Sequence, residues 1–131
     1  RIWLRRTSAW GAVLAAVVAL AFLPRTGGGD GPSHVAQLSG DDFAITARLS
    51  GDRVVIAERT GFVPTGRVLE LWLIVDDAAP VSLGIVGQST RRFPLPVAEG
   101  SILAVSLEPN GGSPTGAPTG PVVASGPLIA R

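Results

Sequence analysis

Apolar and polar residues alternate along much of this chain in short runs that end at turn-forming residues. A period of two places successive side chains on opposite faces of a strand, so this pattern predicts half-buried β-strands. The segments that we interpret as strands of this kind are residues 43–49, 53–59, 81–86, 93–97, 102–107 and a short return at 122–125. Pro94 and Pro96 have no backbone N–H to donate to a neighbour, so residues 93–97 are expected at a sheet edge.

Residues 68–75 differ from these runs because nearly every position is apolar, with Asp76, Asp77 and Pro80 ending the run. Such a segment predicts a strand that is covered on both faces, near the middle of the fold. Seven or eight short strands without a credible helix after residue 34 favour an antiparallel β-sandwich. We therefore predict one β-sandwich domain at residues 34–131.

The first 33 residues follow another pattern. Residues 7–24 are eighteen consecutive uncharged residues, and as a helix they would reach about 27 Å, close to the thickness of a bilayer core. The sequence thus predicts a single transmembrane α-helix at 7–24, a basic cytoplasmic flank at 1–6 and a Gly/Pro tether at 25–33. The residues expected to orient the helix, with the N-terminus in the cytoplasm, are Arg1, Arg5, Arg6, Trp3 and Trp10.

A cleaved secretory signal is the alternative interpretation of this segment, since Ala19, Leu20 and Ala21 resemble a cleavage site. The apolar stretch continues beyond that site to Leu23, and the chain does not open with Met. Both observations favour an anchor over a cleaved signal.

Charge and composition narrow the function further. Residues 1–25 carry four Arg and no acid, whereas residues 26–131 carry seven Arg and ten acids, so the basic cluster belongs to the membrane flank. This distribution argues against nucleic-acid binding. Cysteine is absent, which excludes disulfides, thiolate metal sites and cysteine nucleophiles.

Residues that could carry catalysis or bind a metal are few. His34 is the only histidine and is placed at the end of the tether, outside the strand pattern. The acidic pairs at 41–42 and 76–77 lack the spacing of a calcium loop and are interpreted as turn residues. No serine lies in a nucleophile elbow, and no phosphate-binding loop is present. We expect no enzyme activity, no metal and no cofactor, and no effect on activity from changing His34 or Glu108.

Residues 113–116 and 117–120 form a tandem repeat, Ser-Pro-Thr-Gly followed by Ala-Pro-Thr-Gly. Proline, threonine and glycine suit an ordered loop that closes the sandwich, while long loops on a rigid sheet also carry binding sites. The residues of this candidate structural or partner loop are Glu108, Pro109, Gly111, Gly112, Pro114, Thr115, Pro118 and Thr119.

At residues 70–74, 79–84 and 103–121 the chain resembles the C-terminal domain of the RskA-type anti-sigma-K factors, and the long 103–121 stretch is the most specific part. The resemblance implies a single-pass protein of the bacterial inner membrane whose β-domain lies outside the cytoplasm. It also implies an extracytoplasmic-function (ECF) sigma factor as the partner of a cytoplasmic N-terminal part that is missing here. Envelope and intramembrane proteases would release that sigma factor in sequence. No catalytic or metal-binding residue is carried over.

The sequence therefore favours the anchor and extracytoplasmic sensor or shield of an anti-sigma factor. The shield would control protease access to the tether, where the candidate cleavage region is Gly27, Gly28, Gly29 and Asp30. An anchored or secreted β-sandwich that binds a component of the cell envelope, without any role in transcription, is the alternative.

Overall fold

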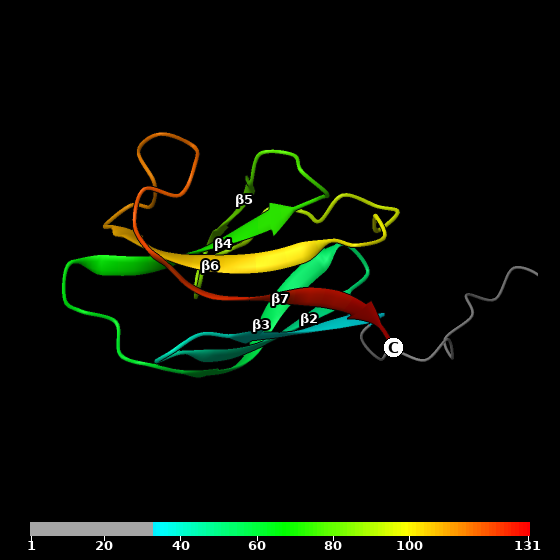
Figure 1. Cartoon of the computed structure of the whole chain (residues 1–131), viewed down its shortest axis with the longest axis horizontal. Helices are drawn as coiled ribbons and strands as arrows, with labels where there is room; N and C mark the ends of the chain where they lie inside the picture. Colours follow the sequence, from blue (N-terminus) through cyan, green and yellow to red (C-terminus); the bar gives the residue numbers. More distant parts are fainter. Residues whose placement is uncertain (1–32) are drawn as a thin grey trace, which may run out of the picture. The chain divides into compact units, whose positions relative to one another are not determined.

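The computed structural model describes residues 33–131 (Figure 1), and these residues form an all-β unit in which every paired strand is antiparallel. Its seven strands are β1 (His34–Ser39), β2 (Ala44–Ser50), β3 (Arg53–Thr60), β4 (Arg67–Ile74), β5 (Val81–Ile85), β6 (Ile102–Pro109) and β7 (Val122–Ala130). The all-β class and the antiparallel arrangement are confirmed. The transmembrane helix predicted at 7–24 lies outside the described residues. Within residues 33–131, no helix has the length and apolar character needed to cross a bilayer.

The strands form one continuous sheet in the order β3-β2-β1-β7-β6-β4-β5, where the sequence had predicted the two separate sheets of a sandwich. The sheet is curled like half a barrel. It stays continuous because β7 is paired with β1 along one edge and with β6 along the other. β7 thus joins the hairpins of the N-terminal half to the strands β4, β5 and β6.

Three local predictions need correction. Residues 93–97 contain no strand, because prolines at alternate positions leave too few N–H donors for a ladder even at an edge. His34, which was placed outside the strand pattern, is the first residue of β1. The return at 122–125 continues to Ala130 in β7, through Gly126 and Pro127.

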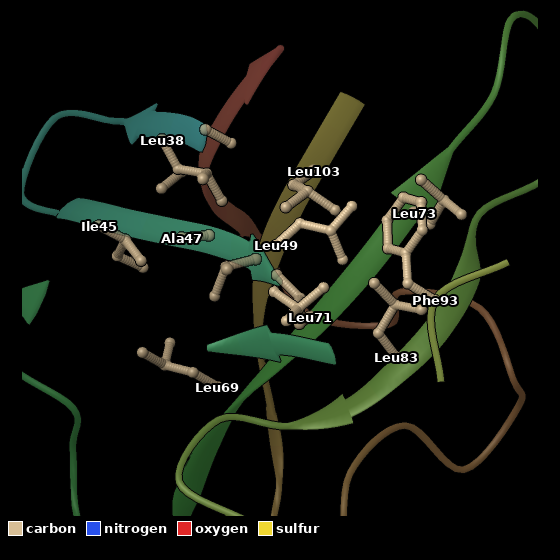
Figure 2. Close-up of a cluster of buried hydrophobic side chains, with 14 of the residues drawn as sticks. Leu38, Ile45, Ala47, Leu49, Leu69, Leu71, Leu73, Leu83, Phe93 and Leu103 are labelled. Carbon is tan, nitrogen blue, oxygen red and sulfur yellow. The ribbon is translucent and has the colours of Figure 1, made fainter. Parts of the chain in front are cut away.

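The concave face of the curled sheet encloses the hydrophobic core. Figure 2 shows Leu38, Ile45 and Leu49 of the N-terminal half gathered with Leu71 and Leu103 of the other half. All five are almost completely buried, and Phe93 from the segment after β5 also joins this cluster. The core lies entirely within residues 33–131, and residues 31–131 form a compact unit of their own.

β4 is buried on both faces, as its apolar run predicted. Leu69, Leu71 and Leu73 enter the core, while Glu70 and Trp72 are buried on the opposite, convex face. In the sheet, however, β4 is next to the edge strand β5 and not central. The cover on its convex face comes from the loop between β6 and β7.

The strand directions give the unit two ends. One is the Ser33 end: the Ser33 N–H donates to the Leu49 carbonyl at 2.8 Å, and the Arg131 N–H donates to the Ser33 carbonyl at 3.1 Å. The other is the loop end, where residues 110–121 connect β6 to β7. Figure 1 shows this orange loop at the far end of β7 from the C-terminus. A segment N-terminal to Ser33 therefore joins the sheet at the end opposite the loop.

A substitution at Gly126 tests how far the pairing of β7 with β1 stabilises the fold. A Cβ atom added there would lie 2.0 Å from the Gln37 carbonyl oxygen of β1, far inside van der Waals contact. We expect Gly126→Ala to force β7 and β1 apart and to lower the free energy of unfolding of residues 31–131 by about 1–3 kcal/mol. Urea unfolding followed by the fluorescence of Trp72 measures this change.

The exposed neighbour Ser125 in the same strand is the control. Ser125→Ala should change the free energy of unfolding by no more than about 0.5 kcal/mol. Equal midpoints for Gly126→Ala and the unchanged protein would show that the close contact between β7 and β1 does not limit stability.

Candidate functional site

Two glutamates on the convex face hold the loop at residues 110–121. Glu70 of β4 is 7% exposed and accepts hydrogen bonds from the Ser82 hydroxyl of β5 and the Ser113 N–H of the loop, both at 2.6 Å. One carboxylate thus connects the edge strand, β4 and the start of the tandem repeat. Hydrogen bonds to a charged acceptor are stronger than those between neutral groups.

Glu108 of β6 is completely buried. Its Oε1 atom accepts hydrogen bonds from the Ser106 hydroxyl at 2.7 Å, the Thr119 N–H at 2.8 Å and the Gly120 N–H at 3.2 Å. The Thr119 hydroxyl donates to the second carboxylate oxygen, Oε2. Four donors thus surround this carboxylate: the Ser106 hydroxyl and three groups of Thr119 and Gly120 in the second repeat. The loop therefore closes over Glu108.

Trp72 extends the same network beneath the loop. Its indole N–H donates to the Ser106 hydroxyl at 2.8 Å, and that hydroxyl donates in turn to Glu108. Trp72 is completely buried but does not belong to the core cluster on the concave face. The convex face of β4 and β6 thus has a small buried layer of its own, in which the Trp72 ring packs beside polar side chains that are all hydrogen-bonded.

The register of β4 and β6 explains how these residues meet. Glu70 is opposite Ser106, and Val68 is opposite Glu108. Directly opposite residues project to the same face of a sheet, and residues two apart in one strand do so as well. Glu70, Trp72, Ser106 and Glu108 consequently project to one side, although 34 residues separate Trp72 from Ser106.

Burial and hydrogen bonding have opposite effects on the Glu108 carboxyl. Burial alone raises its pKa, because the charged form loses water. The hydrogen bonds from the Thr119 side chain, the Ser106 hydroxyl and the two backbone N–H groups outweigh that effect and lower the pKa below its ordinary value. Glu108 is therefore held as a carboxylate at neutral pH, and its negative charge keeps the loop closed.

The two copies of the repeat have different structural roles. In the first, the Ser113 and Thr115 hydroxyls both donate to the Ala117 carbonyl, so the repeat folds on itself at the surface. In the second, Thr119 and Gly120 bind Glu108. A Cβ atom on Gly120 would lie 1.7 Å from the Leu107 carbonyl oxygen. Only glycine allows this close approach, so the second repeat attaches the loop to β6.

The residues predicted for this loop divide accordingly. Glu108 and Thr119 bind each other, and the Gly112 N–H donates to the Pro109 carbonyl in the turn after β6. The exposed members of the predicted set are Pro109, Gly111, Pro114, Thr115 and Thr119, and Gly112 and Pro118 are half-buried. Whether the exposed members contact a partner stays a prediction.

Sequence reasoning missed Glu70, Ser82, Ser106 and Trp72 as parts of this site. Glu70 did carry a signal, because it is the one charged residue inside the apolar run 68–75. A charge at such a position must be neutralised or hydrogen-bonded when its strand is covered on both faces. In residues 33–131, no buried side-chain nitrogen or oxygen is left without a hydrogen-bond partner.

The other candidates lie elsewhere. His34 Nδ1 is 3.1 Å from the Ser33 hydroxyl, and the acidic pairs at 41–42 and 76–77 are in the turns after β1 and β4. The described residues contain no group of three or more side chains suited to hold a metal. The proposed membrane-orienting residues and cleavage region lie outside the described residues: Arg1, Arg5, Arg6, Trp3, Trp10, Gly27, Gly28, Gly29 and Asp30.

The comparison with protein families matches the part of the chain that contains this site. The family described as "Anti-sigma-K factor rskA, C-terminal" matches residues 8–122, which include β1 to β6 and the whole tandem repeat. The chain belongs to this RskA family. Searches of curated proteins and of solved structures gave no match. Membership supports a regulatory role as an anti-sigma factor, with a sigma factor as partner, and it confirms the resemblance seen in the sequence.

The tandem repeat provides a matched pair of variants to test the attachment of the loop. Thr119→Val removes a hydroxyl donor to Glu108, and we expect a loss of about 1.5 kcal/mol in the free energy of unfolding, as for one hydrogen bond to a charged group. Thr115→Val makes the same chemical change in the first repeat and should cost no more than about 0.5 kcal/mol. Urea unfolding of residues 31–131 measures both; equal losses would contradict the different roles of the two repeats.

The lowered pKa of Glu108 predicts a pH dependence with a definite sign. A carboxyl whose pKa is lower in the folded state stabilises the fold above its ordinary pKa, about 4.3 for Glu. That contribution is lost as the pH falls through the lowered, folded-state value. We expect Glu108→Gln to be less stable than the unchanged protein at pH 7, and the gap to narrow progressively below about pH 5.

Unfolding midpoints of both proteins at a series of pH values measure this gap. The remaining acids titrate in both proteins, so their effects cancel in the difference. A gap that stays constant or widens in acid would show that the Glu108 carboxylate does not hold the loop.

Proposed function

We propose that residues 33–131 are the extracytoplasmic shield of a membrane-anchored anti-sigma factor. The shield controls when proteases reach the tether at residues 25–33 and thereby controls the release of an ECF sigma factor. The helix at 7–24 is the anchor, with its N-terminal side in the cytoplasm and the β-unit on the far side of the inner membrane. The sigma factor is held by a cytoplasmic part N-terminal to the anchor. Family membership supports the regulatory class, and the position of β1 supports the shield.

The position of β1 is the observation that carries the proposal. This strand begins at His34, directly after the tether, and is hydrogen-bonded to β2 on one side and β7 on the other. Proteases generally need several residues of extended, unpaired chain. To offer β1 as such a substrate, the unit would have to break both ladders and expose Ala36 and Leu38, which are buried in the core. A protease that cuts the tether and must also hold residues after Ser33 is therefore excluded until β1 leaves the sheet.

The loop at residues 110–121 is the part through which a signal can act. It leads directly into β7, and β7 is paired with β1. A ligand or partner that draws Thr119 and Gly120 away from Glu108 loosens the start of β7. Because β7 is the neighbour of β1, this loosening lowers the cost of exposing the chain around Ser33. The exposed residues Gly111 and Pro114 are the contact points in this mechanism.

A sigma-dependent reporter tests the proposed function in cells that express the protein from its complete gene. Deleting residues 34–131 removes the shield, so we expect the tether to be cut without a signal and the reporter to rise to its fully induced level. Thr119→Val should raise the uninduced reporter in part, because it weakens the attachment of the loop. Thr115→Val, the matched control, should leave the uninduced level unchanged.

An unchanged reporter after deletion of residues 34–131 would overturn the proposal, provided that immunoblotting shows the shortened protein in the membrane fraction. Immunoblotting also reports the cleavage position. A first cut C-terminal to Ser33 in the unstimulated, full-length protein would show that β1 does not restrict the protease.

A further inference from the structure

The convex face has a second feature on the opposite half of the sheet, away from the loop. One row of side chains crosses four strands there: Ile129 of β7 is opposite Val35 of β1, Val35 is opposite Arg48 of β2, and Arg48 is opposite Val55 of β3. Ile129 is 62% exposed and Val55 is 55% exposed. A shallow groove lies along the part of this row that belongs to β7, β1 and β2, and Pro127 and Ala130 contribute to its lining. Large apolar side chains are thus displayed together on a sheet face that has no cover within residues 33–131.

Arginines border this apolar row on the side toward the Ser33 end. Arg48 lies within the row, and the exposed Arg53 and Arg131 lie beyond it. Glu58 is the acid nearest on this face, opposite Thr46, on the side toward the loop end. Asp52, in the turn between β2 and β3, is paired with Arg92 at 3.3 Å. On the convex face of β7, β1, β2 and β3, the charged side chains nearest the Ser33 end are therefore arginines, whereas Asp76, Asp77 and Glu99 lie in turns at the same end of the β4–β6 half.

The site lies close to where the anchor is proposed to leave the membrane. Ser33 is hydrogen-bonded to Leu49 and Arg131, at the same end of the sheet as the arginines. Residues 25–33 separate it from the proposed anchor, and nine residues span at most about 30 Å in any conformation. The Ser33 end thus cannot move farther than that from the membrane surface if residues 7–24 cross the bilayer.

We propose that this face, centred on Ile129, Val35, Arg48 and Val55, docks on a surface of anionic lipid headgroups. The inference rests on the proposed function for the anchor and adds a second point of membrane contact. The arginines pair with lipid phosphates, and the apolar side chains enter the interfacial region, as in other peripheral membrane surfaces. Docking presses the Ser33 end against the bilayer and leaves no room for a protease at the tether. Release from the lipid exposes the tether.

The docking only needs to be weak. Each arginine near an anionic surface strengthens binding by about fivefold. A tether of nine residues holds the face at an effective concentration in the millimolar range, so a contact that is negligible for the free unit becomes substantial for the anchored one. Weak docking also makes the contact reversible, as a regulated shield requires.

Fluorescent labelling tests the docking directly. The chain contains no cysteine, so Val55→Cys and Thr115→Cys each provide one attachment point for an environment-sensitive dye. Residues 31–131, with a histidine tag in place of residues 1–30, are captured on vesicles through a nickel-chelating lipid, which reproduces the tether. We expect a blue shift and quenching by brominated lipid for the dye at position 55 on phosphatidylglycerol vesicles. The dye at position 115, at the loop end, should show neither.

Charge variants supply the controls. Replacing both Arg48 and Arg131 with Gln should reduce the docked fraction at least tenfold, and added salt should have a similar effect. Replacing both Arg59 and Arg67, which lie toward the loop end, should leave docking unchanged. Both double variants keep the core intact, and circular dichroism verifies that each is folded.

Three outcomes would overturn the inference: no change in the dye at position 55, an equal change on neutral phosphatidylcholine vesicles, or a change that depends on protein concentration and not on lipid. The last would identify the face as an interface between copies of this chain. Failure of the proposed function is seen separately, in the sigma-dependent reporter. If the protein docks on vesicles but deletion of residues 34–131 does not change the reporter, the proposed shield is refuted. The lipid-binding face would still be confirmed.

Discussion

The double pairing of β7 is the interaction on which the rest of this structure depends. Without it, the chain would contain two separate three-stranded sheets, β3-β2-β1 and β6-β4-β5, each with one face that needs cover. By pairing with β1 and β6 together, β7 joins them into one curled sheet whose concave face closes on a shared core. Two three-stranded pieces could not each bury enough apolar surface to be stable alone. β7, the last strand within residues 33–131, therefore completes the fold.

The polar layer on the convex face fixes where β7 begins. Glu108 and Glu70 belong to neighbouring strands and bind successive parts of the loop, Ser113 to Glu70 and then Thr119 and Gly120 to Glu108. Pro121 follows Gly120 directly, and its carbonyl accepts a hydrogen bond from the Leu107 N–H at 3.0 Å. These two anchored residues just before β7 fix the register in which β7 pairs with β6. Buried carboxylates are costly unless all their hydrogen bonds are satisfied. Here that requirement specifies one loop conformation.

The sequence pattern predicted the strands better than their partners. Alternation identified β2, β5 and most of β6 because it reports which face of a strand is buried. It does not report which strands are neighbours, and for that reason one curled sheet could not be distinguished from a two-sheet sandwich. β1 was overlooked because small Ala36 faces the core where a larger residue would have marked the pattern. Gly126 and Pro127 ended the prediction of β7 early, since Pro seldom occurs in an inner strand.

Only the part of the candidate site formed by consecutive residues could be predicted from the sequence. Proline, threonine and glycine at residues 113–120 indicated an ordered loop, but two identical Pro-Thr-Gly units gave no reason to assign them different roles. Their difference comes from tertiary contacts: Thr119 reaches a carboxylate eleven residues earlier, whereas Thr115 bonds to Ala117, two residues on. The link from Glu70 to Ser113 spans 43 residues. Long-range contacts of this kind depend on the register of β4 and β6, which no local pattern contains.

The order of the strands also gives the loop a physical route to the other end of the unit. β7 starts at the Glu108 site and ends beside Ser33, and its pairing with β1 extends from Ser125 opposite Ser39 to Ala130 opposite His34. This shared ladder is the direct backbone connection from the loop to β1, because β1 and β6 are not paired with each other. A strand with a glycine and a proline at its centre has fewer ladder bonds there, so its two halves can loosen in sequence. Gly126 and Pro127, which ended the sequence prediction of β7 too early, thus make this strand suited to transmit a change from the loop end to the Ser33 end.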